Sequence, residues 1–458
     1  MPIARRSLPF VAALGVLLAF LALLATSPAS AAPEPSPLPP DVREALDAML
    51  ECERPDGGWM YVCHSGVRVF GATAVVNLAE RVGDAFGLAD WDIVVLRSPG
   101  TAAAGEILLD VHERTGEAAL LASARRAGDL LVNLQLPNGG WYSEMPVRGD
   151  RLADWFLAVA PWATLDDDVT SGGVRFLLAL WQRTGDVKYR EAAERGLALL
   201  LDAQLENGAW PLTWRPRLRR WLSPSFEDLP SLNDAATTAV VRTLLVASRT
   251  LDRPDLLAAA QRGADWLVSV RSPSPLAGWA QQYSEDGVPV AGRRFEPAAL
   301  AAWESRLALE ALDAVAAATG DVSYCRTFHE SLEWLARAEL RPRCWARFYS
   351  LDSDAPIYLD RAGHPVDDPR RAKRPYRWTG DFGIPYLRAR LDAERASHER
   401  PAPFRISGDS GVCPGEYRWD FPRVDSPNPR VRIGILATRL AALEAPPAAF
   451  CIESRLDP

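Results

Sequence analysis

Gln135-Leu-Pro-Asn-Gly-Gly-Trp141 recurs in the chain as Gln204-Leu-Glu-Asn-Gly-Ala-Trp210, and the two tryptophans are 69 residues apart. Trp279 follows Trp210 at the same interval. A second mark recurs at nearly the same spacing and has the form Arg114-Thr-Gly-Glu117, Arg183-Thr-Gly-Asp186, Arg249-Thr-Leu-Asp252 and Ala318-Thr-Gly-Asp321. Two independent marks in phase indicate a tandem repeat whose period accommodates two helices and their loops.

The segments between the marks have helical periodicity. In Val187 to Gln204, apolar residues such as Leu197 and Leu200 alternate with charged ones such as Arg190 and Glu194 at helical spacing. We therefore predict an all-α fold of tandem helical hairpins. A single hairpin cannot bury its apolar face, so the hairpins stack, either as an open solenoid or as a closed α/α toroid. We expect the Gly-Gly pairs to allow a tight turn and the indoles to fill the gaps between hairpins.

The two ends of the chain differ from the repeats. Residues 1–32 have the features of a signal peptide: two arginines, an apolar run from Phe10 to Ala25, and a small-residue cleavage site at Ala29-Ser-Ala31. An uncleaved membrane anchor is the alternative. Residues 33–40 form a Pro-rich linker, residues 41–388 the helical domain, and residues 389–458 a short, irregular capping tail. These features predict a secreted or periplasmic protein without stable membrane association after cleavage.

The six cysteines indicate disulfides, because their number is even and the chain is exported. We predict the sequential pairs Cys52–Cys63 and Cys325–Cys344, since each closes a local loop. Free buried thiols are the alternative, because spacing alone does not fix the geometry of a disulfide.

The formal net charge of −8 argues against general nucleic-acid binding. Two basic clusters nevertheless occur in loop-like sequence, and a solvated surface is the ordinary explanation for such runs. On an acidic protein they also indicate a groove for an anionic ligand. The clusters are Arg215, Arg217, Arg219 and Arg220, and Arg370, Arg371, Lys373, Arg374 and Arg377.

Acidic residues precede two predicted helices. Asp166, Asp167 and Asp168 stand together before the first helix, and helix capping accounts for one or two of them. Asp234 follows 68 residues after Asp166, before the next predicted helix. Because loops at matched positions of adjacent hairpins emerge at the same end, we expect Asp166 and Asp234 to converge. Oxygen ligands from separate elements suit a hard cation such as calcium.

Arginines occupy the loops that follow. Arg293 and Arg294 precede Glu296, and Arg347 lies in Trp345-Ala-Arg-Phe-Tyr349. They could simply form ion pairs. A calcium position combined with arginines also matches a sugar carboxylate, which arginine binds through two parallel hydrogen bonds. The histidines show no zinc spacing, and the sequence has neither a Gly-x-Ser-x-Gly motif nor a phosphate-binding loop.

With these residues in place, the chain resembles the family 10 polysaccharide lyases, which are pectate lyases with an α/α toroid. The similar stretch runs from about Asn138 to Phe382, and an N-terminal segment from Asp41 to Leu134 adds at least one hairpin. Six motifs occur in the family's order: Asn138-Gly-Gly-Trp141 with Asn207-Gly-Ala-Trp210; Asp166 to Thr170; Leu232-Asn-Asp-Ala-Ala236; Arg293-Arg-Phe-Glu296 with Glu304-Ser305; Trp345-Ala-Arg-Phe-Tyr349; and Asp360-Arg361-Ala-Gly363 with Tyr376-Arg-Trp378-Thr-Gly-Asp381.

The resemblance implies calcium-assisted β-elimination of a polygalacturonate-like chain. By similarity, Arg293 abstracts the proton with Asp166 beside it, and Asp166 and Asp234 bind calcium. Arg347 would hold the substrate carboxylate, and Trp141, Trp210 and Arg377 would contact the substrate. Two other functions remain open. A terpene cyclase toroid also carries an acidic motif, although Asp166-Asp-Asp-Val169 lacks its last acid, and a toroid that binds acidic polysaccharide without cleaving it would retain the same loops.

Overall fold

The computed structural model describes residues 37–60, 63, 93–147, 162–360, 362–372, 377–385, 387, 428–441, 443 and 451. The predicted signal peptide, residues 1–32, lies outside these residues, as do residues 33–36 of the predicted linker and most of residues 389–458. Within the described ranges, no helix combines the length and apolar character needed to cross a membrane.

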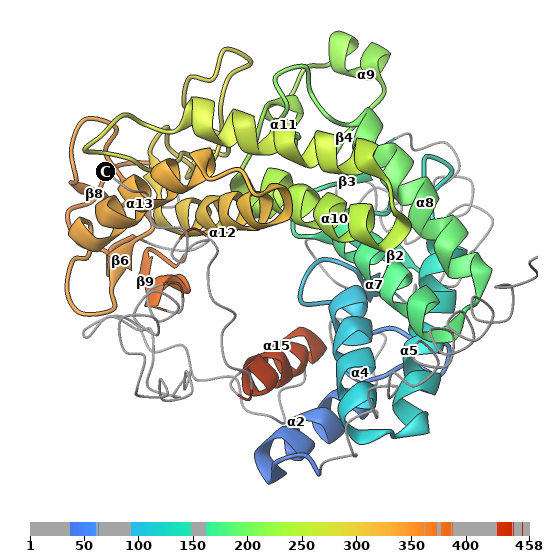
Figure 1. Ribbon diagram of the computed structural model, residues 1–458. Helices are drawn as coiled ribbons and strands as arrows, with labels where there is room; N and C mark the ends of the chain where they lie inside the picture. The colour runs from blue at the N-terminus through green and yellow to red at the C-terminus, as the bar shows by residue number, and fades with distance from the viewer. Residues whose placement is uncertain are drawn as a thin grey trace, which may run out of the picture.

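Helical hairpins form the body of the molecule, as the repeat predicted. In each hairpin the first helix lies on the inside of a ring and the second on the outside (Figure 1). The inner helices pack against one another in chain order. Among the described residues, the inner and outer pairs are α4 (Thr101–Thr115) with α5 (Ala118–Leu134), α7 (Val169–Thr184) with α8 (Val187–Asp202), α10 (Ala236–Leu251) with α11 (Pro254–Val270), and α12 (Ala302–Thr319) with α13 (Ser323–Arg337).

Helices from the two ends of the chain pack together beside α4. Helix α2 (Pro40–Leu50) lies against α15 (Pro429–Ala441), and α15 also contacts α4 (Figure 1). Arg432 joins the two helices, because its Nη1 donates to the carbonyl of Ala48 at 2.6 Å and to Glu51 Oε2 at 3.0 Å. This arrangement is a helical toroid, so the predicted fold class is confirmed. Within the stretch predicted as a capping tail, α15 forms part of the ring.

Five tryptophans occupy the same position in successive repeats. Their indoles are fully buried, with 0% exposure. The indole N–H of each donates to a carbonyl near the end of the preceding outer helix, or of α2 in the first repeat. The pairs are Trp59 to Met49, Trp141 to Leu131, Trp210 to Leu200, Trp279 to Leu267 and Trp345 to Leu335. The predicted packing role is confirmed, and the repeat extends to Trp59 and Trp345.

The burial of Trp141 and Trp210 also corrects the second role that we predicted for them. An indole with no exposed surface cannot stack on a sugar, so the prediction that these two residues contact substrate is wrong. Their motif serves the turn instead. Gly139 and Gly208 have φ values of 93° and 98°, and an added Cβ would lie 2.3 Å and 2.4 Å from the carbonyl oxygens of Arg195 and Arg262. Only glycine fits such a close approach.

Short antiparallel strands connect the loops of neighbouring repeats at one end of the ring. Such pairs fix the loops relative to one another, which matters for the site described below. The pairs are β1 (Ile93–Val95) with β2 (Glu144–Pro146), β3 (Ala163–Thr164) with β4 (Thr213–Trp214), β5 (Leu300–Ala301) with β7 (Phe348–Tyr349), β7 with β8 (Pro356–Ile357), and β6 (Trp345–Ala346) with β9 (Thr379–Gly380). A short helix, α9 (Arg217–Leu222), and two 3₁₀ turns, η1 (Phe226–Asp228) and η2 (Asn233–Ala235), lie between β4 and α10.

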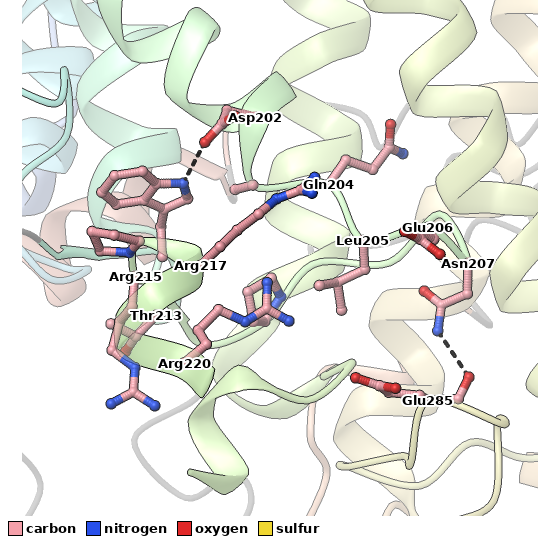
Figure 2. Close-up of a pocket in the computed structure, with 14 residues that line it drawn as sticks. Asp202, Gln204, Leu205, Glu206, Asn207, Thr213, Arg215, Arg217, Arg220 and Glu285 are labelled. Atoms are coloured by element: carbon pink, nitrogen blue, oxygen red, sulfur yellow. Dashed lines mark hydrogen bonds between the residues drawn. The ribbon is translucent and has the colours of Figure 1, made fainter. Parts of the chain in front are cut away.

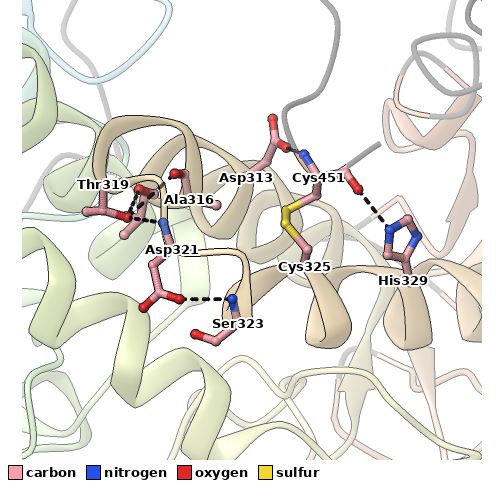
Figure 3. The surroundings of a disulfide bond; sticks show 9 residues. Asp313, Ala316, Thr319, Asp321, Ser323, Cys325, His329 and Cys451 are labelled. Atoms are coloured by element: carbon pink, nitrogen blue, oxygen red, sulfur yellow. Dashed lines mark hydrogen bonds between the residues drawn. A yellow bond between two sulfur atoms is a disulfide. The ribbon is translucent and has the colours of Figure 1, made fainter. Parts of the chain in front are cut away.

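The disulfides confirm one of the two predicted pairs. Cys52 is bonded to Cys63, as predicted, but Cys325 is bonded to Cys451 and not to Cys344 (Figure 3). Cys325 lies in the first turn of α13, whereas Cys344 follows the end of that 15-residue helix. A helix of this length spans about 22 Å, far beyond the reach of a disulfide. Cys344 is disulfide-bonded as well, to a different partner.

Candidate active site

The acidic residues lie where β3 and η2 lead into two adjacent inner helices. Asp167 and Asp168 have φ values of 51° and 58°, and Asp234 and Ala235 repeat this pair at 47° and 66°. Left-handed backbone is costly for residues other than glycine and is concentrated at functional sites. The repeated conformation shows that Asp234 corresponds to Asp167, so the equivalence with Asp166 that the sequence suggested is shifted by one residue.

Direct backbone contacts hold these loops together. The N–H of Asp167 donates to the carbonyl of Asp234 at 2.7 Å, and the N–H of Asp166 donates to the carbonyl of Leu212 at 3.1 Å. Leu212 immediately precedes β4, which pairs with β3. The predicted convergence of the two acidic loops is therefore present in the structure.

The carboxyl groups share one electrostatic environment. Burial, followed by the charges of Asp167 and Asp234, raises the pKa of Asp166 well above its usual value. Burial and Asp234 raise the pKa of Asp167 to about 6, against the opposing effect of Arg97. Burial also raises the pKa of Asp234, against the opposing effects of Arg293 and Arg347. Carboxylates that raise one another's pKa in this way repel each other when ionised, so a bound cation would stabilise the ionised cluster.

Arg293 lies beside this acidic cluster. Its Nη1 is 2.8 Å from Glu296 Oε1 and 3.5 Å from Asp234 Oδ2. Glu296 is buried and also accepts the backbone N–H of Arg293 at 2.6 Å, which fixes the loop that carries the arginine. The side chain of Arg293 is 36% exposed, so solvent or a ligand can reach it.

Arg347 is more buried than Arg293. Its Nη2 donates to Glu304 Oε1 at 3.1 Å, and the same oxygen accepts from Gln281 at 2.6 Å. Burial raises the pKa of Glu304, and Arg347 opposes that effect. Because Arg347 also acts on the pKa of Asp234, the structure brings together Asp166, Asp234, Arg293 and Arg347. Their individual roles stay predictions.

Arg377 is exposed and lies at the edge of the same region. It precedes Trp378, whose carbonyl accepts the N–H of Arg347 at 2.8 Å. This contact links the loop of Arg377 to the loop of Arg347 through the backbone. The predicted role of Arg377 in substrate binding also stays a prediction.

Two features that the sequence did not reveal support the acidic loops. Asp168 does not cap α7 with its side chain. It binds Arg175 instead, with Nη1 to Oδ1 at 2.9 Å. Arg175 also lies 3.3 Å from Glu106 of α4 and donates to Thr243 of α10, so it joins three inner helices beneath the site. The sequence signal for this contact was Arg175 itself, a charged residue inside the apolar run of α7.

The second feature is Arg97, which approaches the acidic loops from the end of β1. Its Nη2 is 2.9 Å from Glu144 Oε1, and its Nη1 is 4.0 Å from Asp167 Oδ2. No repeat mark or motif pointed to this residue.

A metal site was predicted at Asp166 and Asp234. The described ranges contain no ready-made group of three or more acidic, histidine or cysteine side chains placed to hold a metal. The two aspartates supply the hard oxygen donors that calcium prefers, so a cation between them would need water, backbone or substrate to complete its coordination.

The first basic cluster borders a cavity of 540 Å³ between α9 and the loop after α8. Arg217 and Arg220 extend toward that loop, whereas Arg215 points away and pairs with Asp228, with Nε to Oδ1 at 2.8 Å (Figure 2). Trp214 on the cavity wall donates its indole N–H to Asp202 at 2.8 Å.

In the second basic cluster, Arg370 pairs with Asp368 within one turn at 2.6 Å, while Lys373 and Arg374 lie outside the described residues. Arg370 of the second cluster therefore forms an ordinary surface ion pair.

The family model described as pectic acid lyase matches residues 152–342, which include Asp166, Asp234 and Arg293. Over this region the chain resembles pectic acid lyases. The match confirms the resemblance that the ordered motifs indicated, and Arg347 lies just beyond its end. No curated protein matches the chain.

Solved structures similar to this chain include a lyase and two sugar-converting enzymes. The family 10 polysaccharide lyase from Cellvibrio cellulosa is 20% identical and has a TM-score of 0.48, with 65% of this chain and 98% of that chain covered. A D-mannose isomerase is 12% identical with a TM-score of 0.56, covering 89% and 99%. The cellobiose 2-epimerase from Spirochaeta thermophila is 14% identical with a TM-score of 0.51, covering 90% and 100%. The isomerase and the epimerase show that the fold is shared over most of the chain.

Proposed function

We propose that this protein is an exported polysaccharide lyase that cleaves a polyuronate by β-elimination. The observation that carries the proposal is the placement of Arg293 against the acidic cluster of Asp166 and Asp234, within the region that matches pectic acid lyases. Two arginines, Arg293 and Arg347, flank this cluster and are suited to bind a negatively charged sugar.

The chemical difficulty of the reaction is the weakly acidic proton on C5 of the sugar. Its removal places negative charge on the neighbouring carboxylate. The oxygen on C4 then leaves with the bond electrons and takes a proton from water, and an unsaturated sugar remains. Arg347 is suited to bind that carboxylate, because a guanidinium has five donors and can serve Glu304 and a ligand together. Such a cation stabilises the developing charge.

Arg293 is assigned the proton transfer by similarity to the pectic acid lyases, and its position beside the acidic cluster supports that assignment. Its Nη1 lies between Glu296 at 2.8 Å and Asp234 at 3.5 Å, and its side chain is open to a ligand. Asp166 lies beside it in the same cluster. A calcium ion bound by Asp166 and Asp234 would neutralise both the acidic cluster and the uronate carboxylate.

Export is part of the proposal. Disulfides such as Cys52–Cys63 and Cys325–Cys451 form and persist in oxidising compartments. Together with the apolar run from Phe10 to Ala25, they favour a secreted or periplasmic protein.

The test is Arg293→Lys, measured by the ultraviolet absorbance of unsaturated product from polygalacturonate. We expect turnover to be abolished while binding of the polymer is retained, because the proton transfer belongs to the transition state and not to the ground state. Arg253→Lys is the matched control, since Arg253 forms an exposed pair with Asp255 at the start of α11.

Two further variants separate the roles. Arg347→Ala should weaken binding, and Asp234→Ala should lower activity in a way that added calcium partly restores. Equal, modest losses of rate in all three variants would show that these residues only support the fold. A wild-type protein that binds polygalacturonate but yields no product, at any calcium concentration, would be a binding toroid and not a lyase.

A further inference from the structure

The acidic cluster belongs to a longer series of loops that follows the inner wall of the ring. The N–H of Ser98 donates to the carbonyl of Asp167 at 2.8 Å, and the N–H of Asp167 donates to the carbonyl of Asp234 at 2.7 Å. These residues immediately precede α4, α7 and α10, three consecutive inner helices. The same backbone contact therefore links successive loops into one continuous arc.

The charges along this arc alternate. Arg97 stands at the α4 end, the aspartates lie in the middle, and Arg293 and Arg347 stand at the α12 end. We propose that Arg97 binds a second carboxylate of the substrate, on a sugar beyond the one held at Arg293 and Arg347. This inference rests on the proposed polyuronate substrate and extends it to a binding path along the ring.

The geometry of Arg97 supports such a role. Its backbone is fixed next to β2, because the N–H groups of Leu96 and Arg97 both donate to the carbonyl of Ser143, at 2.8 and 3.3 Å. Its guanidinium is anchored by Glu144, which is only 1% exposed, while the side chain of Arg97 is 30% exposed. Glu144 thus orients a guanidinium whose exposed part lies beside Asp167. A planar guanidinium can serve two carboxylates at once, as Arg175 does with Asp168 and Glu106.

A second cation reinforces this end of the arc. Arg430 of α15 donates from Nη2 to the carbonyl of Ser98 at 2.6 Å. Arg97 and Arg430 both lie outside residues 152–342, in the segments that complete the ring. The additional subsite would therefore be supplied by the parts of this chain that lie outside the matched region.

Distance separates this subsite from the reacting sugar. The two aspartate loops stand between the guanidinium groups, since Arg97 lies 4.0 Å from Asp167 and Arg293 lies 3.5 Å from Asp234. A uronate held at Arg293 and Arg347 therefore does not fill the position at Arg97, whereas further sugars of a longer chain can. Loss of Arg97 should accordingly affect long substrates more than short ones.

The test uses Arg97→Ala/Glu144→Gln, because Arg97→Ala alone would leave the buried Glu144 charge without its anchor. We expect KM for polygalacturonate to rise about tenfold, as for the loss of one charge-assisted contact. Because Arg97 also contacts Asp167, the constants for digalacturonate report any disturbance of the acidic cluster, and KM for the polymer should rise by more than KM for digalacturonate. Arg97→Lys, which keeps the charge, should recover part of the loss. Arg126→Ala/Glu53→Gln is the control, because it removes a like pair, 2.7 Å apart, elsewhere in the N-terminal part of the toroid.

Affinity electrophoresis in gels containing polygalacturonate separates this inference from the proposed reaction. If the wild type yields no product but the double variant migrates with weakened affinity, the lyase proposal fails and the subsite stands. If the wild type is an active lyase and the variant keeps its KM for the polymer, the inference is overturned. A proportional change in kcat on both substrates would also overturn it, since that result indicates a disturbed active site.

Discussion

Asp167→Asn should make the protein more stable at neutral pH, although it removes a charge from the candidate site. Burial and the charge of Asp234 raise the pKa of Asp167 from 3.8 to about 6. A carboxyl group whose pKa is raised by folding stabilises the fold while it is protonated. That contribution is complete below pH 3.8 and is lost as the pH rises through about 6. Above that range, the ionised form opposes folding.

The expected magnitude follows from this difference in pKa. At about 1.36 kcal/mol per pH unit, the difference between 3.8 and about 6 corresponds to roughly 3 kcal/mol. The side chain of Asp167 is 32% exposed, so solvent screening reduces this to roughly 1–2 kcal/mol. Asparagine has nearly the same shape but no charge, and the variant should gain this amount at pH 8.

The assay is urea-induced unfolding of both proteins at pH 8 and pH 4, in buffer with a chelator. We expect a higher free energy of unfolding for the variant at pH 8 and equal values at pH 4. Asp286→Asn, at an exposed loop position, is the control and should show no such dependence on pH. A variant no more stable than the wild type at pH 8, or a difference that persists at pH 4, would refute the electrostatic argument.

Two other variants test the supports of the site and the ring. Arg175→Ala should lower the free energy of unfolding by about 3–5 kcal/mol, because it leaves Asp168 and Glu106 without their cation. The control is Arg183→Ala, which breaks the exposed pair with Glu113. It should lower the free energy of unfolding by about 1 kcal/mol or less in the same urea titration. Cys325→Ser/Cys451→Ser should cost more than Cys52→Ser/Cys63→Ser in thermal unfolding. The two disulfides close separations of 126 and 11 residues, worth roughly 5 and 3 kcal/mol in the chain-entropy account, and equal losses would contradict that ranking.

The repeat made the fold predictable because the same local physics recurs at each turn. Every Gly-Trp segment needs glycine for a tight backbone turn and tryptophan for a buried indole. The repeat can therefore be recognised from the residue types alone. Trp59 and Trp345 were not counted as repeats, since neither keeps the 69-residue interval. The one-residue shift between Asp166 and Asp167 became clear only from the left-handed backbone at Asp167 and Asp234.

Contacts between distant parts of the chain could not be predicted in the same way. Arg430 reaches Ser98 across 332 residues, and Cys451 reaches Cys325 across 126. Neither contact has a local pattern, because each depends on how completely the ring closes. The sequential pairing of Cys325 with Cys344 was wrong for a related reason, since proximity in sequence does not bring together the two ends of a straight helix.

The pairing of α2 with α15 has a consequence for biosynthesis. Arg432 and Glu51 contact each other across 381 residues, so the partner of α2 leaves the ribosome only after all the intervening hairpins. Local hairpins can form early, but contacts of such large sequence separation form slowly because the loop between them must first be closed. Until α15 arrives, the face of α2 that packs against α15 has no cover, and exposed faces of this kind favour aggregation. Among the described helices, the face of α2 that packs against α15 therefore waits longest for its partner.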